Sequence, residues 1–357
     1  MPFTAAELTE AGKSSQDFFL KNKRVDQVNT ERPLLKKLKS KQKNAPGGKE
    51  NVVAQLRKSN SSNFQWYIGS KVVTYNKRRN IEQAKFPWRS AHDGFALDED
   101  RLLQNGIIID ENGKGKNASN TELIQLDNLL AEEVEALDLG FDEKFDQALH
   151  LDGTQDADAV GGLDLIISLT PATGTIGSID ASSASNIWWR NHAATGLTVT
   201  TTTGTIVDKM EAAWRACIRN GGLPDFILAG TDFIDGYRQH MMKTYGQVNY
   251  GAKEAKTVDG GSGMKGTDSN LSFQGVPIIW DPVFQELDTL YAPGTPWEKR
   301  CYFINTKHLT LRPLEGHDMK SRNPPRPYDK YEWYWGQTWK GALVTDRRNA
   351  HAVLAIA

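Results

Sequence analysis

The sequence contains two cysteines and no long apolar run. Cys217 and Cys301 form neither a C-x-x-C pair nor a spacing typical of metal ligands, so we expect reduced, buried thiols in a cytosolic product. No apolar segment approaches the roughly 20 residues that a membrane-spanning helix needs. The N-terminus lacks the basic and apolar regions of a signal peptide. These absences argue against a secreted, disulfide-bonded protein and against a membrane protein.

Motifs of the common enzyme classes are also missing. No G-x-G-x-x-G follows a predicted strand, and neither H-E-x-x-H nor G-x-S-x-G occurs. The glycine-rich segment 260–266 does not meet the phosphate-loop pattern. His92-Asp93 and His150-x-Asp152 could each ligate a metal, but a surface or satisfied histidine is the commoner explanation of such pairs. The sequence therefore predicts no enzyme, no cofactor and no metal.

Charge is nearly balanced in total but unevenly divided along the chain. The 43 Lys and Arg against 44 Asp and Glu give a formal net charge of -1, which argues against nucleic-acid binding by the whole protein. Residues 1–62 are polar and basic, and their densest part contains Lys36, Lys37 and Lys39. By composition this stretch is a disordered tail. It would bind nucleic acid, aid solubility or lie across a neighbouring subunit.

A long amphipathic helix is predicted at 119–150. Apolar residues recur there every three or four positions, and Ser119 with Glu122 forms an S-x-x-E capping box. Gly140 should cost about 1 kcal/mol relative to Ala, so a kink or a helix end could fall there. The solvent side is almost entirely acidic and includes Glu132 and Glu135. Such a face is either solvated or meets a basic partner, and the tail is a candidate.

Residues 63–97 are predicted to form a long two-stranded ribbon. Segments 64–68 and 72–75 are rich in β-branched and aromatic residues, and 81–88 would return. The tip would be the charged segment 76–80, which contains Lys77, Arg78 and Arg79. Two interpretations stay open: an ordinary hairpin of a sheet, or a projecting loop stabilised on another molecule, because an isolated hairpin is marginal in water.

The remaining chain predicts an α+β fold with a small sheet. Helices are expected at 206–219 and 231–243. Strands are expected at 225–230, 272–280, 301–305, 308–314, 331–335 and 350–357. No internal repeat is visible in the sequence.

Four short motifs follow one another in this region. They are Trp188-Trp189-Arg190-Asn191, Pro224-Asp225-Phe226-Ile227-Leu228, Phe273-Gln274-Gly275-Val276-Pro277-Ile278 and Cys301-Tyr302-Phe303-Ile304-Asn305. They stand in a series of basic arm, ribbon, long acidic helix, α+β domain and strand-rich end. This series resembles the tailed-bacteriophage major capsid proteins of the HK97-type fold. The resemblance covers nearly the whole chain from about residue 60, and the order of the motifs carries more of it than any one of them.

The resemblance implies a division of the chain. Its parts would be an N-terminal arm (1–62), an E-loop (63–97), a P-domain (98–160) with a spine helix at about 119–150, an A-domain (161–300), returning P-domain strands (301–345) and a final strand (346–357). Copies would form hexamers and pentamers of an icosahedral shell around packaged double-stranded DNA, in a virion made in the bacterial host cytoplasm. The implied partners are other copies of the chain, a portal protein, and scaffolding or decoration proteins, with no sequence-specific DNA contact and no membrane.

In such a shell the E-loop lies over the P-domain of an adjacent subunit. The residues expected in contacts between subunits are Trp66, Tyr67, Lys77, Arg78, Arg79, Trp88, Glu132, Glu135, Lys36, Lys37 and Lys39. An exposed ion pair contributes only about 0–1 kcal/mol, so the three aromatic residues should carry more of the contact energy. A local core cluster is the alternative explanation of these aromatics.

Two other functions stay open at this point. One is an intracellular, metal- or nucleotide-dependent α+β enzyme that would use acidic residues to bind the metal. The other is a nucleic-acid-binding protein that uses the basic arm, whose affinity would fall steeply with salt.

Overall fold

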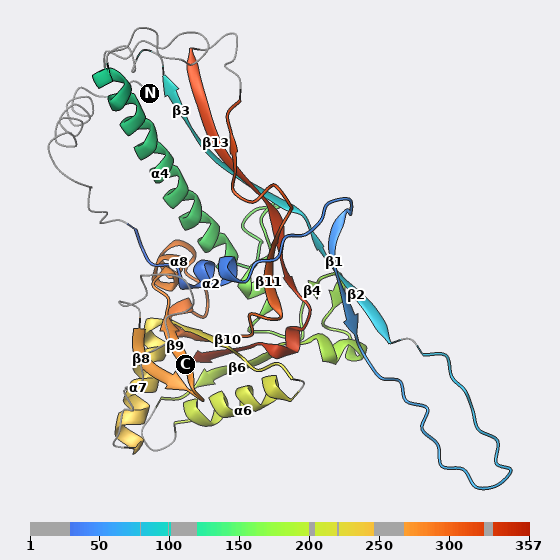
Figure 1. The fold of residues 1–357 in the computed structure, drawn as a ribbon. Helices are drawn as coiled ribbons and strands as arrows, with labels where there is room; N and C mark the ends of the chain where they lie inside the picture. The colour runs from blue at the N-terminus through green and yellow to red at the C-terminus, as the bar shows by residue number, and fades with distance from the viewer. Residues whose placement is uncertain are drawn as a thin grey trace. The chain divides into compact units, whose positions relative to one another are not determined.

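The computed structural model describes residues 29–78, 80–98, 100, 120–199, 204–219, 221–245, 268–324 and 331–357. Helices and strands are mixed along this part of the chain (Figure 1), which is the α+β organisation that the sequence predicts. The described residues form two compact units. The first contains His92–Asp142 and Ser321–Gln337, and the second contains Glu31–Ala91, Glu143–Lys320 and Thr338–Ala357.

The helices and strands of the described residues have the following bounds. The helices are α2 (Pro33–Ser40), α4 (Asn120–His150), α5 (Leu163–Ile166), α6 (Ile206–Ile218), α7 (Thr231–Tyr245) and α8 (Val283–Tyr291), with the short 3-10 helices η1 (Ala184–Trp189), η2 (Trp297–Lys299) and η3 (Arg348–Ala350). The strands are β1 (Asn51–Arg57), β2 (Ile81–Pro87), β3 (Arg89–Asp98), β4 (Thr175–Ile176), β5 (Ile179–Asp180), β6 (His192–Leu197), β7 (Phe226–Ala229), β8 (Asp268–Phe273), β9 (Val276–Trp280), β10 (Arg300–Ile304), β11 (Leu309–Pro313), β12 (Lys320–Arg322), β13 (Glu332–Thr345) and β14 (Ala352–Ile356).

The long helix predicted at 119–150 is present as α4, which spans 31 residues. At 1.5 Å per residue it is roughly 45 Å long. It continues through Gly140 as one helix, so the kink or end considered there does not occur. Leu137, Phe141, Phe145 and Leu149 are buried, and their spacing of four places them along one side of the helix.

A six-stranded mixed sheet lies in the second unit, with the strand order β6-β14-β10-β7-β9-β8. β10 is antiparallel to both β14 and β7, whereas β14 is parallel to β6 and β7 is parallel to β9. All residues of β7, β10 and β14 are buried. These three interior strands have nearly continuous apolar sequences, as expected for strands covered on both faces.

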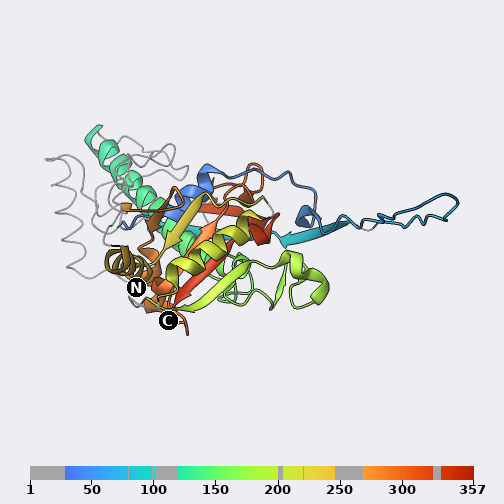
Figure 2. The same ribbon diagram turned by 90° about the horizontal axis from the view of Figure 1, so that it is seen from below.

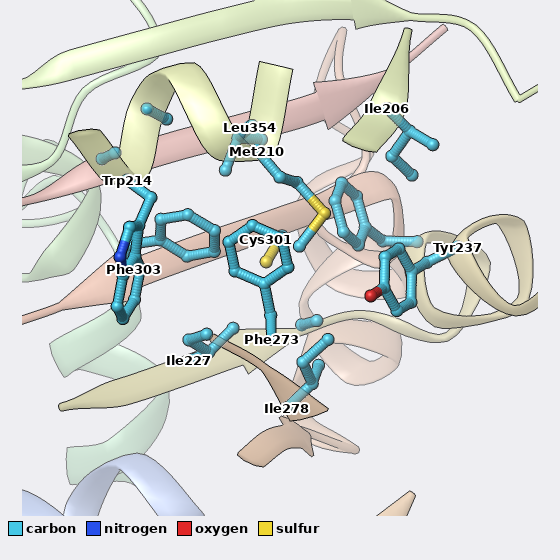
Figure 3. Packing of buried hydrophobic residues seen from close by; sticks show 14 of the residues in the cluster. Ile206, Met210, Trp214, Ile227, Tyr237, Phe273, Ile278, Cys301, Phe303 and Leu354 are labelled. Atoms are coloured by element: carbon cyan, nitrogen blue, oxygen red, sulfur yellow. The ribbon is translucent and has the colours of Figure 1, made fainter. Parts of the chain in front are cut away.

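One face of this sheet packs against α6 and α7 (Figure 3). The ring of Trp214 lies edge-on to those of Phe273 and Phe303, at 5.9 Å from each, and these two phenyl rings stack at 5.8 Å. Cys217 and Cys301 belong to the same apolar cluster and are free and buried. Burial raises the pKa of the Cys217 thiol to about 12, so the thiol stays protonated and acts as a small apolar side chain.

The strands between 301 and 345 belong to two different sheets. β10 does not join β11 and β13 but lies between β14 and β7 in the six-stranded sheet. β11 pairs instead with β13, from Leu309 opposite Thr345 to Pro313 opposite Gly341, and β13 also pairs with β12 and β3. The five consecutive buried residues of β10 fit its place as an interior strand covered on both faces.

β1 and β2 form an antiparallel ribbon, from Asn51 opposite Pro87 to Arg57 opposite Ile81. Alternate residues of both strands are buried against β4, β5 and η1, together with part of β13. Gly177 lies against Ala84 of β2. Its φ is +61°, and there is no room for a side chain, because an added Cβ would lie 2.9 Å from the Ala84 Cβ. The base of the ribbon is therefore fixed on the second unit.

The disordered tail predicted at 1–62 is wrong for the described part of that stretch. α2 begins with Pro33, whose fixed φ suits the first helical turn. Leu34, Leu35 and Leu38 of this helix are at most 3% exposed, and the helix packs on β11. Composition does not predict this helix, because the lysines between the leucines make the average character of the stretch polar and basic.

After α2 the chain runs beside β11 before it enters β1. The Lys43 N–H donates to the Leu311 carbonyl at 3.0 Å, and the Ala45 N–H donates to the Pro313 carbonyl at 2.8 Å. The chain is thus anchored at α2, beside β11 and in β1.

η3 contains an arginine that is completely buried. Arg348 Nε donates to the Ile166 carbonyl at 2.6 Å and Nη1 donates to the Pro171 carbonyl at 3.3 Å. Desolvation lowers the pKa of Arg348 to about 10, and the charge of Arg190 acts in the same direction. These bonds tie the turn before β14 to the end of α5.

Candidate assembly surfaces

The segment between β1 and β2 leaves a row of large apolar side chains in solvent. Their exposed fractions are 82% for Trp66, 66% for Tyr67, 91% for Ile68, 83% for Val72 and 92% for Tyr75. Figure 2 shows this segment continuing beyond the two strands as an extended loop. Contiguous exposed apolar surface of this kind usually marks an interaction site. This loop, residues 58–80, is the first candidate surface.

The strands predicted at 64–68 and 72–75 are wrong, because residues 58–78 contain no strand. The two limbs of the loop are joined through polar side chains instead. The Asn63 amide donates to the Thr74 carbonyl, and the Gln65 amide bonds the Thr74 hydroxyl. β-propensity largely measures packing of a side chain against its neighbours in a sheet, and the aromatic residues here face solvent.

The predicted charged tip is also misplaced. The turn lies at residues 69–70, where Gly69 has a φ of +57°, and it is flanked by the apolar Ile68. The charged segment lies on the returning limb. Lys77 and Arg78 are exposed there, and Arg79 lies outside the described residues.

Trp88 has a different environment from the loop aromatics. Its indole Nε1 donates to the Lys49 carbonyl at 2.9 Å, and its ring packs on the apolar cluster at the base of the ribbon. The local-core explanation therefore fits Trp88, whereas Trp66 and Tyr67 have the exposure that a contact residue needs.

The other charged candidates lie on α2 and α4. Lys36 is exposed, and the Lys37 ammonium lies 5.7 Å from the centre of the Phe226 ring, within the range of a cation–π interaction. Lys39 and Glu132 are half-buried, and Glu135 is exposed. A single chain does not test contacts between subunits, so the roles of these residues stay predictions.

The buried end of α4 holds a histidine between two carboxylates. His150 Nδ1 lies 2.8 Å from the Asp146 carbonyl and 3.7 Å from Asp146 Oδ2, and Nε2 lies 2.9 Å from Asp281 Oδ2. All three side chains are buried. The backbone N–H of Leu35 donates to Asp146 Oδ1 at 3.1 Å, and that of Val283 donates to Asp281 Oδ1 at 3.1 Å.

Electrostatics make His150 a cation at neutral pH. Burial alone would lower its pKa, but the carboxylates of Asp146 and Asp281 outweigh burial and raise the pKa to about 9. Burial raises the pKa of Asp146 to about 7, against the opposing charge of His150. The motif His150-x-Asp152 does not predict this arrangement, because Asp152 accepts hydrogen bonds from Thr154 instead.

Neither a metal centre nor a membrane span is found where the structure describes the chain. Among the described residues, no group of three or more His, Cys, Asp and Glu side chains could hold a metal ion. The helices of the same residues are all too short or too polar to cross a lipid bilayer.

Solved phage and particle capsids share this fold over almost the entire chain. The chain of the cyanophage A-1(L) capsid asymmetric unit has a TM-score of 0.55 and 17% identity, and the match covers 95% of this chain and 97% of that one. The capsid of the native GTA particle has a TM-score of 0.55 and 12% identity, with coverages of 96% and 98%. The capsid of Myoviridae phage XM1 has a TM-score of 0.54 and 13% identity, with coverages of 95% and 98%.

By sequence, the chain matches no protein-family model and no curated protein. Its fold is that of phage capsid chains. The expectation of a tailed-phage capsid fold, drawn from the order of short motifs, is confirmed at the level of structure.

Proposed function

We propose that this chain is the major capsid protein of a tailed phage. The observation that carries the proposal is the match to capsid chains over nearly the full length of both partners. A shared single domain would leave much of one chain uncovered, whereas here each match covers at least 95% of both chains. Copies of the chain would form hexamers and pentamers of an icosahedral shell in the virion.

The exposed loop 58–80 supports the proposal, because it offers apolar surface for a second copy. Full burial of a Trp or Tyr removes about 150–250 Å² from solvent, which is roughly 4–6 kcal/mol at about 25 cal/mol per Å². Partial burial and the ordering of the loop reduce this gain, so about 2 kcal/mol or more per anchor is expected. Trp66 and Tyr67 are the proposed anchors, and both belong to the proposed E-loop (63–97).

Charged contacts between copies would fix how adjacent subunits align and would contribute little binding energy. In this proposal Lys77, Arg78 and Arg79 face acids of an adjacent copy, among them Glu132 and Glu135 of α4. Lys36, Lys37 and Lys39 would contribute from the arm. Exposed pairs of this type are each worth about 0–1 kcal/mol, and they weaken with salt.

The remaining parts of the proposal concern partners. The shell would enclose double-stranded DNA without reading its sequence, which fits a formal net charge of -1. A portal protein, together with scaffolding or decoration proteins, would complete the particle. No observation favours the alternative of an α+β enzyme or of a basic-arm nucleic-acid-binding protein.

Assembly of the purified full-length chain tests the proposal directly. We expect sedimentation velocity and negative-stain microscopy to show closed shells or rings of subunits. A chain that stays monomeric or dimeric at high concentration, even after co-expression with a scaffolding protein from the same phage, would contradict the capsid function.

The loop anchors need a separate pair of variants. The double substitution Trp66→Ser and Tyr67→Ser should raise the critical concentration for assembly at least tenfold, since a loss of about 1.4 kcal/mol per contact corresponds to a factor of ten. The matched control, Trp66→Phe with Tyr67→Phe, keeps the apolar surface and should assemble nearly as the original chain does. Equal assembly by both pairs would refute the anchor role while leaving the capsid function intact.

A further inference from the structure

Three segments that are distant in sequence meet at His150, and each makes a different bond there. α4 supplies the histidine and Asp146, the link between β9 and α8 supplies Asp281, and α2 supplies the Leu35 N–H that Asp146 accepts. The attachment of α2 and the position of α8 therefore depend on one buried network.

The hydrogen-bond partners of the His150 ring favour its doubly protonated form. Both ring nitrogens of His150 face acceptors, namely the Asp146 carbonyl and the Asp281 carboxylate. An imidazolium donates to both, whereas a neutral imidazole has one N–H and leaves a lone pair against the other oxygen. Asp146 Oδ2 has no hydrogen-bond donor of its own and lies 3.7 Å from His150 Nδ1, so the charge of the imidazolium, together with that of Arg32, offsets the charge of this carboxylate.

Charged side chains surround the network on every element packed against it. The arm contributes Arg32, whose charge acts on Asp146 and whose Nη2 lies 3.5 Å from Glu143 Oε2. α4 also carries Lys144, 3.6 Å from Glu143, and α8 carries Glu286, which accepts from the Gln147 amide at 3.1 Å. Phe284 covers the ring of His150 edge-on at 5.4 Å. Arg32 offsets part of the negative charge, but it does not donate to His150 in place of the lost proton.

We propose that Asp146, His150 and Asp281 form a proton-controlled latch, which holds α2 on the end of α4 while the imidazole is doubly protonated and releases α2 when that proton leaves. Loss of the proton leaves two buried carboxylates without a cation between them, and burial of uncompensated charge is strongly unfavourable. α2 joins the network through one bond, from the Leu35 N–H to Asp146, and is otherwise held by its buried leucines. This inference goes beyond the capsid function and does not rest on it.

The direction with pH follows from the two shifts. The pKa of His150 is raised from 6.5 to about 9, and that of Asp146 from 3.8 to about 7. In both cases the folded network binds protons more tightly than the unfolded chain does, so its stability falls as the pH rises. The contribution of Asp146 is lost between about pH 4 and 7, and that of His150 between about pH 6.5 and 9. The latch is closed in acid and opens in mild alkali.

Trypsin can report release of α2, because Lys36, Lys37 and Lys39 lie within this helix. Native-state cleavage tracks the population of the open form. The full-length chain is digested briefly between pH 7 and 9.5 with a free reporter peptide in the same tube, and mass spectrometry gives the ratio of cleavage within α2 to cleavage of the reporter. We expect the ratio to rise at least tenfold over this range.

Variants separate the latch from general alkaline unfolding. His150→Gln removes the titrating group and should give a flat ratio, and Asp146→Asn, which keeps an acceptor for Leu35, should rise at most threefold. His308→Gln is the matched control, because His308 pairs with Asp346 in a partly exposed site, and it should behave as the original chain does. A flat ratio in the original chain, an equal rise in Asp146→Asn, or parallel cleavage after the buried Arg300 would overturn the proposal.

Discussion

Leu38→Ala measures how far α2 belongs to the folded core. Leu38 is 1% exposed, and the substitution removes three carbon groups, worth about 2.4 kcal/mol at roughly 0.8 kcal/mol each. The cavity left behind adds to this, and buried Leu→Ala changes cost about 2–5 kcal/mol. We expect a loss of about 3 kcal/mol in the free energy of unfolding. The loss cannot exceed the free energy that docks α2, because a helix already undocked has nothing further to lose.

The assay is urea unfolding of the full-length chain, followed by tryptophan fluorescence at a concentration where all variants have the same oligomeric state. With a slope of about 3 kcal/mol per molar, the midpoint should fall by about 1 M. Lys36→Ala is the matched control on the same helix. Its side chain is exposed, and Lys and Ala have similar helix propensities, so a change within about 0.5 kcal/mol is expected.

Equal midpoints for Leu38→Ala and Lys36→Ala would refute this reasoning. That outcome would mean that α2 contributes nothing to the folded unit, as a disordered tail would.

Three other substitutions probe the backbone and a buried charge. Gly140→Ala lies inside α4, where an added Cβ meets no atom within 4 Å, so it should raise the unfolding free energy by about 0.5–1 kcal/mol in the same urea assay. Gly162→Ala should lower it by more than about 2 kcal/mol, because its Cβ would lie 2.3 Å from the carbonyl oxygen of Leu149 and 2.4 Å from that of Leu151. Arg348→Ala deprives two carbonyls of donors and should cost about 3 kcal/mol. An unchanged midpoint for either destabilising variant, or a lower one for Gly140→Ala, would contradict the packing described above.

The long helix could be predicted because its signal is local. Leucine, valine and phenylalanine recur every three or four residues from 123 to 149, and this period alone indicates a helix. The short strands and helices between 206 and 356 carry similar local signals, and most were predictable to within a few residues.

The loop could not be placed by the same reasoning. Trp66, Ile68, Val72 and Tyr75 have the composition of strands, but that preference is realised only when a side chain packs on a neighbouring strand or layer. Nothing in the sequence tells whether the partner belongs to the same chain. These residues are exposed because the paired strands are 51–57 and 81–87, which leaves the segment between them without a strand partner.

Long-range pairing was equally hidden. Asp281 is 131 residues from His150, and no spacing rule relates the two. The sheet that holds β10 could not be predicted for the same reason, since the apolar residues 301–304 fit an interior strand of any sheet. A partial signal did exist for α2, where Pro33 precedes leucines at 34, 35 and 38, a pattern that the lysine-rich average obscured.

The place of β14 in the six-stranded sheet has a consequence for biosynthesis. β14 joins β6 to β10, so β6 cannot gain its described partner until residues about 160 positions later have been made. At roughly 5–20 residues per second, that interval is about 8–30 s on the ribosome. During this time β6 is an unpaired strand that can pair with another chain. The sheet is thus complete only after residue 356 leaves the ribosome. Until then, β6 of one nascent chain can pair with a strand of another chain on the same messenger RNA.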